Sequence, residues 1–347
     1  MSDAGSPYLP YLDSWRGLAI GLLLIGHFFP FAGINLGALG VNLFFVLSGF
    51  LMARVLFIDK APLPIFYKRR IARIFPTVLV FIGGIVLAYC AIGRPVSWRE
   101  TAAAALFVIN YFPGAPGAAV MPFGHIWSLC VEEHSYILLS LAALLVRAKG
   151  VSARLAVGML AAACGAGALV HWFSYTGEHL VFDRWIHTEV SAYGIFMSAF
   201  LMLWLRDRDI TRVHFVPLAL LAAGGLALQW WSVPLPVGTI VGVGAFALLI
   251  NLLPAAPAWV HAALSFRPLR QLGMWSFSIY LWQQPFYRYV ATDGMRPLPA
   301  VCLALLAGIA SYYLLERPAR MYLNRRWAGK QDDAGTTAGV NEVSTLA

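Results

Sequence analysis

Residues 15–32 read WRGLAIGLLLIGHFFPFA, and an apolar run of this length can cross a hydrocarbon layer of roughly 30 Å as a helix. Comparable runs of about 16 to 22 residues recur along most of the chain. The sequence of 347 residues is 60% hydrophobic and only 12% charged. One soluble core cannot bury so much apolar surface, so lipid must be the solvent. Because backbone polar groups in lipid must be satisfied internally, we predict an all-α fold, a polytopic transmembrane helical bundle.

The chain contains about ten candidate spans. They cover approximately 15–32, 37–57, 74–93, 125–146, 155–173, 186–205, 213–231, 234–253, 272–291 and 297–315. Residues 101–112 (TAAAALFVINYF) are too few to span, so we expect a re-entrant or surface helix there.

The distribution of basic residues gives the predicted orientation. With both termini in the cytoplasm, 18 of the 25 Lys and Arg residues lie in inner segments and 5 in outer ones. This bias is the positive-inside pattern. It also explains the net charge of +9 without a nucleic-acid partner. We therefore predict a cytoplasmic segment 1–14, a membrane domain 15–320 and a disordered cytoplasmic tail 321–347, in a multi-pass integral membrane protein.

The N-terminus and the cysteines show no processing or metal signal. Asp3 and Asp13 stand where a cleavable signal peptide would carry basic residues, so the first span is expected to remain as an anchor. The four cysteines have no C-x-x-C spacing, which predicts neither a disulfide framework nor a zinc site. No metal site and no permanently bound cofactor are predicted.

Ionisable residues inside spans are functional candidates, because each costs free energy in lipid. Arg16 and His27 are eleven residues apart, which places them on nearly one helix face and about 16 Å apart along the axis. We expect Arg16 at the cytoplasmic edge and His27 near the bilayer centre, where an imidazole can act as a general base. Alternatively, Arg16 snorkels to the interface and His27 only bonds to a neighbouring helix.

A second cluster lies in HIWSLCVEEHSYILL (125–139). His125, Ser128, Glu132 and Tyr136 share one helix face, whereas Glu133 is rotated away by about 100°. Glu132 is therefore the carboxylate expected in the bundle interior, near the level of His27. It either takes part in catalysis or makes an inter-helix structural hydrogen bond.

A third element is the basic run FYKRRIARIFP (66–76). Its Lys68, Arg69, Arg70 and Arg73 are expected at the cytoplasmic mouth of the bundle. Such a run is either an ordinary positive-inside loop or a clamp for the phosphates of a cytosolic donor such as coenzyme A.

Together these motifs resemble the acyltransferase family 3 membrane proteins, which include O-antigen, exopolysaccharide and Nod-factor acetylases. The resemblance runs from Tyr11 to Arg320. It rests on LDSWRGLAIGLLLIGHF (12–28), GVNLFFVLSGFLM (40–52), KRRIARIFP (68–76), HIWSLCVEEHSY (125–136), FSIYLWQQP (277–285) and ERPAR (316–320). Family members often have His where this chain has Gln283, and often have Gln where it has His134.

The resemblance implies a membrane O-acyltransferase in which Arg16 and His27 are the essential pair. The implied donor is a cytosolic acyl-coenzyme A, most simply acetyl-coenzyme A, and the implied acceptor is a hydroxyl of a carbohydrate or glycolipid. Roles in the site or donor path are implied for Arg69, Arg70, Arg73, Trp127, Ser128, Glu132, Tyr280, Trp282, Glu316 and Arg317.

Several alternatives stay open at this level. The three aromatic residues among those positions are either interface packing or stacking platforms for a sugar or donor. Glu316 and Arg317 are expected to form an ion pair at a helix end, with Pro318 stopping the helix. Transfer is either direct or through an acyl-histidine. A different class of function is a transporter or flippase for a lipid-linked sugar, without acyl transfer.

Overall fold

The computed structural model describes residues 9–112, 121–174 and 185–332. These residues form helices and no strand, and their extended pairings are isolated bridges. The predicted all-α fold is therefore confirmed. The longer helices are α1 (Pro10–Phe28), α2 (Leu36–Ala53), α3 (Leu63–Ala91), α5 (Trp127–Lys149), α6 (Ala153–Ser174), α9 (Tyr193–Leu205), α10 (Phe215–Ala227), α14 (Arg267–Asp293), α15 (Pro297–Ser311) and α16 (Arg317–Asp332).

The shorter elements cap or connect these helices. They are α4 (Trp98–Ala105), α8 (Thr188–Ser191), α11 (Leu235–Val237), α12 (Gly244–Leu252) and α13 (Ala258–Leu264), with 3₁₀ turns at Ile109–Tyr111, Gly124–Ile126 and Leu253–Ala255 and π-helical turns at Arg54–Ile58, Gly238–Val243 and Tyr312–Glu316. Between residues 101 and 112, α4 and a single 3₁₀ turn are both too short to cross a bilayer.

Within the described ranges, seven helical segments are long and apolar enough to cross a membrane: Leu36–Ile58, Leu63–Ala91, Gly124–Lys149, Ala153–Ser174, Thr188–Leu205, Leu235–Ala255 and Pro297–Trp327. Three further predicted spans correspond to α1, α14 and α10. Of these, α10 is apolar but has only 13 residues. The chain is thus an integral membrane protein, and the count of about ten spans with both termini inside stays a prediction.

The first helix begins and ends earlier than the sequence predicted. Pro10 occupies its first turn, where the fixed φ of proline favours a helix start. Pro30 disfavours helical angles at the residue before it, and Phe29 has φ −135° and ψ 69°. His27 therefore lies in the last turn of α1 and not in the middle of a span, which corrects the prediction of a helix over 15–32.

Helices α1 and α14 approach so closely that glycine is needed at their crossing. A β-carbon at Gly273 of α14 would overlap the carbonyl oxygen of Asp13, and one at Gly17 of α1 would overlap that of Leu269. Small residues at such crossings let helix backbones pack against each other in a bilayer. This contact sets the rotation of α1 relative to α14, and with it the direction of every side chain on both helices.

We expect Gly273→Ala to destabilise the protein by about 3 kcal/mol, because overpacking costs roughly 1–3 kcal/mol or more and here the obstacle is backbone. The midpoint of thermal unfolding in detergent, followed by tryptophan fluorescence, measures the effect. The matched control is Gly83→Ala in α3, where an added β-carbon meets no atom within 4 Å. Equal midpoints for the two variants would contradict the assigned role of this crossing.

Two predicted helix boundaries are wrong. The basic run 66–76 was expected in a loop, but α3 begins at Leu63, so the arginines of the run lie on its first turns. Pro318 was expected to stop a helix, yet the helix continues through it, because α15, the π-helical turn Tyr312–Glu316 and α16 follow one another without a break and the π-helical turn directly precedes the proline. Because α16 continues to Asp332, residues 321–332 of the predicted disordered tail are helical, and residues 333–347 lie outside the described part.

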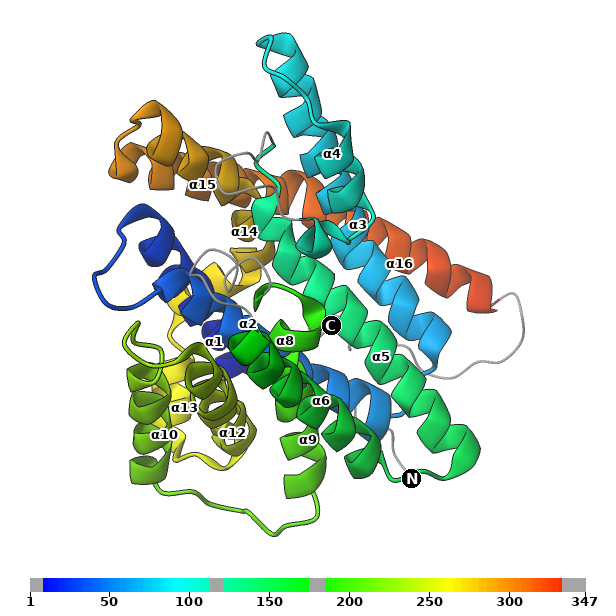
Figure 1. Ribbon diagram of the computed structural model, residues 1–347. Helices are drawn as coiled ribbons and strands as arrows, with labels where there is room; N and C mark the ends of the chain where they lie inside the picture. Colours follow the sequence, from blue (N-terminus) through cyan, green and yellow to red (C-terminus); the bar gives the residue numbers. More distant parts are fainter. Residues whose placement is uncertain (1–8, 113–120, 175–184, 333–347) are drawn as a thin grey trace.

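Figure 1 shows how these helices are arranged. Helix α3 lies beside α5 and α16 at one side of the molecule, and α10, α12 and α13 group at the other. Helices α1 and α2 lie between these groups, and both α1 and α3 contact α14. The arrangement directs side chains of five helices, α1, α2, α3, α5 and α14, toward one interior region.

Candidate functional site

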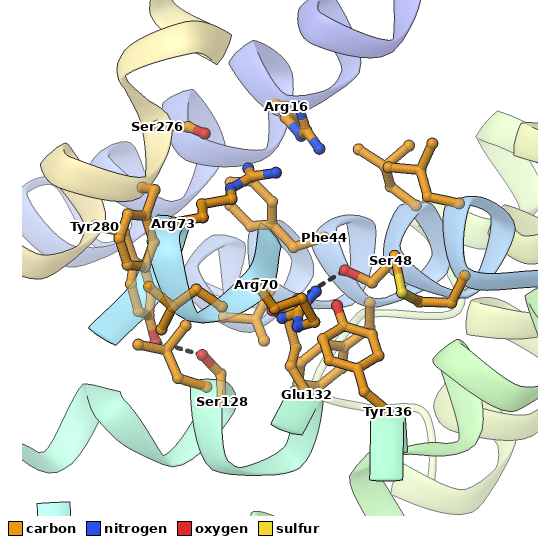
Figure 2. A pocket seen from close by; sticks show the side chains of 18 residues that line it. Arg16, Phe44, Ser48, Arg70, Arg73, Ser128, Glu132, Tyr136, Ser276 and Tyr280 are labelled. Carbon is orange, nitrogen blue, oxygen red and sulfur yellow. Dashed lines mark hydrogen bonds between the residues drawn. The ribbon is translucent and has the colours of Figure 1, made fainter. Parts of the chain in front are cut away.

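A cavity of about 90 Å³ lies where these five helices meet (Figure 2). Its charged lining residues are Arg16, Arg70, Arg73 and Glu132, contributed by α1, α3 and α5. Its other polar lining residues are Ser48, Ser128, Tyr136, Ser276 and Tyr280. Because charged side chains inside a membrane bundle are expensive, four of them around one cavity mark it as the candidate site.

One acidic and one aromatic residue of α5 hold Arg70 in place. Its Nη2 donates to Oε1 of Glu133 at 2.8 Å, and its guanidinium lies 3.5 Å from the centroid of the Tyr136 ring. The Arg70 side chain is only 9% exposed. A buried charge that has both an ion pair and a cation–π partner is neutralised and fixed, so Arg70 serves as a rigid wall of the cavity.

Glu132 faces the cavity, whereas its neighbour Glu133 pairs with Arg70. Ser48 of α2 donates its hydroxyl to Oε1 of Glu132 at 2.8 Å. The second carboxylate oxygen makes no hydrogen bond among the described residues and can accept one from a bound molecule.

Arg73 and Arg16 are the cations with capacity to bind an anion. Arg16 contacts Asp13 at 3.5 Å from Nη1 to Oδ1. Within the described part of the chain, Arg73 makes no hydrogen bond and no ion pair, although it lines the cavity. A free guanidinium at this place suits a phosphate or a developing oxyanion.

The negative charge of Glu316 lies near the positive charges of these two arginines. Glu316 is 2% exposed, and its Oε2 accepts a hydrogen bond of 2.6 Å from Ser278. It also lies within electrostatic range of Arg73 and Arg16. The predicted ion pair between Glu316 and Arg317 is therefore wrong, because the π-helical turn before α16 directs the carboxylate inward toward α14.

His27, in the last turn of α1, lies outside the cavity lining and packs against polar residues of α14. Its Nδ1 is 3.0 Å from Oε1 of Gln283, and its ring stacks on Tyr287 with centroids 4.6 Å apart. Gln283 Nε2 donates to Gln284 Oε1 at 3.1 Å. This contact identifies the nitrogen of the Gln283 amide, so the amide oxygen is the atom that faces His27. Since an amide oxygen only accepts, Nδ1 carries the proton and Nε2 presents a lone pair. That Nε2 makes no hydrogen bond to any residue that the structure describes, and it is not fully buried.

His125 lies between the cavity and His27. It is 5% exposed, and neither ring nitrogen meets hydrogen-bond geometry, although the Leu281 carbonyl is nearby. Its ring centroid is 5.2 Å from that of Tyr280, a cavity residue, and it lies within electrostatic range of His27. Because unsatisfied buried polar groups cost free energy, this imidazole is a functional candidate.

The wall between the cavity and the histidines is a hydrogen-bonded chain. Ser128 Oγ and Tyr280 Oη are 2.6 Å apart, and the Tyr280 hydroxyl donates to the main-chain carbonyl of His125. Ser128 is therefore the donor to Tyr280, whose own proton is already used. These contacts join Ser128 of α5 and Tyr280 of α14 to the main chain of the 3₁₀ turn Gly124–Ile126.

Of the twelve residues with predicted roles, six line the cavity; Glu316 and Arg317 do not line it, and the other four lie elsewhere. Those in the cavity are Arg16, Arg70, Arg73, Ser128, Glu132 and Tyr280. Arg69 is exposed on the outer side of α3, and Trp127 packs edge-on against Phe45 at 6.0 Å. Trp282 contacts Phe81 at 5.3 Å and lines a separate cavity of about 210 Å³. His27, the fourth, has Gln283 of α14 as its hydrogen-bond partner, whereas Glu132 has Ser48 of α2.

Gln283 is the functional candidate that sequence reasoning missed. It was treated only as a departure from the family pattern. The signal was nevertheless present, because Ser276, Tyr280, Gln283 and Tyr287 follow the same i, i+4, i+7, i+11 spacing that identifies one helix face. Applied to α14, this rule would have placed Gln283 on the face of the cavity-lining residues.

Comparison with known proteins identifies a matching family and several similar sequences. The family model described as "Acyltransferase domain" matches residues 9–317. The chain is 27% identical to O-acetyltransferase OatA of Staphylococcus aureus, over 90% of this chain and 57% of that protein. It is 27% identical to peptidoglycan O-acetyltransferase OatA of Listeria monocytogenes, over 89% of this chain and 54% of that protein. The chain thus spans little more than half the length of these curated relatives. No solved structure matches it.

Proposed function

Because the chain belongs to the acyltransferase family whose model matches residues 9–317, we propose that it transfers an acyl group, most simply acetyl, from cytosolic acyl-coenzyme A to a carbohydrate hydroxyl. The observation that carries the proposal is the Gln283–His27 hydrogen bond, which leaves His27 Nε2 as a base. The acceptor class is a polysaccharide, lipopolysaccharide or glycolipid of the cell envelope, and the name of the Listeria relative makes peptidoglycan one candidate.

The proposed topology places both termini in the cytoplasm of a bacterium, with residues 15–320 as the membrane domain. We propose that α1 and α14 cross the membrane in addition to the seven apolar segments. They have 19 and 27 residues, and their close mutual packing beside α2 supports a place inside the bundle. The three arginines of α3 are then near the cytoplasmic side and His27 is toward the opposite side.

The donor enters, in this proposal, from the arginine side. A cavity of about 90 Å³ is too small for a whole coenzyme, so the nucleotide stays at the mouth, where Arg69 is exposed. Arg73 and Arg16 bind an anionic part of the donor inside, and the free oxygen of Glu132 accepts an amide N–H of the pantetheine arm. No resident cofactor is required, because the coenzyme is a substrate.

The chemical step takes place at His27. Nε2 removes the proton of the acceptor hydroxyl while its oxygen attacks the thioester carbonyl. The new C–O bond forms, the C–S bond breaks, and the proton passes from His27 to the departing thiolate. The unpartnered nitrogens of His125 offer a hydrogen bond to the acceptor or the leaving thiol. In the alternative chemistry Nε2 itself attacks, and an acyl-histidine is formed before the alcohol arrives.

We expect Gln283→Leu to lower kcat by about tenfold. The variant loses one hydrogen bond of up to about 1.5 kcal/mol, so the proton of the His27 ring is no longer fixed on Nδ1. Initial rates at saturating acyl-coenzyme A measure this. The matched control is Gln271→Leu on the same helix, whose amide reaches only the Tyr313 hydroxyl at 3.4 Å. Equal rates for the two variants would remove Gln283 from the catalytic arrangement.

The function itself is tested with the purified protein in lipid nanodiscs. We expect consumption of acetyl-coenzyme A only when an envelope glycan acceptor is added, with one acetyl ester gained by the glycan in mass analysis. Cells lacking the protein should lose the same ester from their surface glycans. A glycan that crosses the membrane of proteoliposomes without any coenzyme A release would instead establish the transporter alternative.

A further inference from the structure

A second cluster of polar side chains lies apart from the cavity, where α6 ends and α8 begins. It consists of His171 in the last turn of α6, His187 at the N-cap of α8, and Glu189 in the first turn of α8. His171 Nε2 is 3.7 Å and His187 Nδ1 is 3.2 Å from the same atom, Glu189 Oε1. None of the three lines the cavity described above.

We propose that His171, His187 and Glu189 bind one divalent transition-metal ion, with Zn²⁺ as the ion that suits them best. Two imidazoles and a carboxylate are a common ligand set for zinc. Bonds of about 2.0–2.2 Å in a tetrahedral site place neighbouring ligand atoms roughly 3.3–3.6 Å apart. The two distances to Glu189 Oε1 bracket this range, and all three ligand atoms lie within 4.8 Å of one another. The ion would need only small side-chain movements to enter.

Neighbouring side chains hold the ligands in this orientation. The Tyr111 hydroxyl donates to Glu189 Oε2 at 2.9 Å, which turns Oε1 toward the two imidazoles. The Tyr111 ring also packs on His187, with centroids 4.8 Å apart, and stacks on His134 at 5.9 Å. Hydrogen bonds of this kind to a ligating carboxylate are typical of protein metal sites, where they fix the ligand and tune its affinity.

Three protein ligands leave one coordination position open, as zinc sites that bind a water or substrate do. The ion would join the end of α6 to the start of α8. No spacing rule reveals this site in the sequence, because His171 and His187 are 16 residues apart on different elements. Only the packing of α6 against α8 and α9 brings them together.

Metal content of the full-length protein tests the site. The protein carries a tag without histidines, is placed in nanodiscs, incubated with ZnCl₂ and passed over a desalting column before elemental analysis. We expect one zinc per chain in the wild type and none above background in the double variant His171→Ala/His187→Ala. Tyr111→Phe, which removes only the hydrogen bond to Glu189, is expected to weaken zinc about 10- to 100-fold in a chelator competition.

The control is His214→Ala, an exposed histidine outside the cluster, which should keep one zinc per chain. Should the double variant fail to fold, Glu189→Gln keeps the shape of the side chain and removes its charge. Co²⁺ then gives the visible absorption bands of a tetrahedral site in the wild type and not in Glu189→Gln. A wild type that binds no zinc, or variants that bind as much as the wild type, would overturn the proposal and leave a hydrogen-bonded cluster.

Discussion

His27→Ala is expected to reduce acyl transfer by about 10²- to 10⁴-fold, the usual contribution of a positioned general base. The reason is local: Nε2 is the one nitrogen of the His27 ring with a lone pair, and Gln283 already occupies Nδ1. Initial rates of coenzyme A release in nanodiscs, at saturating donor and acceptor, measure the effect. KM for the donor should change little, because the arginines that bind it are outside the histidine cluster.

The matched control for this variant is His214→Ala, which removes an exposed imidazole from the N-terminus of α10. It should retain the wild-type rate. Thermal unfolding of His27→Ala must resemble that of the wild type, since the ring also stacks on Tyr287. A correctly folded His27→Ala protein with full activity would refute both direct transfer and the acyl-histidine route.

The second large effect concerns the arginines of α3. Arg73→Ala is expected to raise KM for acyl-coenzyme A about 10- to 100-fold, because a hydrogen bond to a charged group is worth about 1.5–3 kcal/mol. Arg73 lines the cavity without any partner of its own among the described residues, so its whole capacity is available to the donor. Arg73→Lys should recover part of the loss, since lysine keeps the charge but not the two-pronged geometry.

Comparison with an Arg69 variant distinguishes an effect of net charge from an effect of the position of the guanidinium. Arg69 is next to the cavity-lining Arg70 on the same helix but is exposed, so Arg69→Ala should raise KM much less than Arg73→Ala. Arg206→Ala, which removes an exposed charge after α9, is the control without an expected effect. Equal losses for the Arg69 and Arg73 variants would show that the run acts only through its net charge.

Helix ends illustrate why the sequence located the helices better than their boundaries. The apolar core of α1 was evident, but Pro10 and Pro30 decide where it starts and stops, and His27 consequently lies in its last turn. At the other end of the chain Pro318 was expected to stop a helix, whereas the helix continues through it from α15 into α16 after a π-helical turn. A proline can start a helix, end one or lie within one next to an irregular turn, so composition alone could not choose between them.

The candidate site shows the same division. The face of α5 that contains Ser128 and Glu132 follows from helical periodicity, and both residues line the cavity. Periodicity gives no information about the rotation of one helix relative to another. It therefore could not tell that Arg70 pairs with Glu133 or that Gln283 is the partner of His27.

From its sequence alone the chain was determined to be an all-α membrane protein, because apolar run length is a property of single helices, and its ordered motifs resemble acyltransferase family 3. The tertiary structure alone decided which charged side chains share a cavity and which imidazole has a free lone pair. It did so through close contacts such as Gly273 against α1, which fix how helices distant in sequence are rotated about one another.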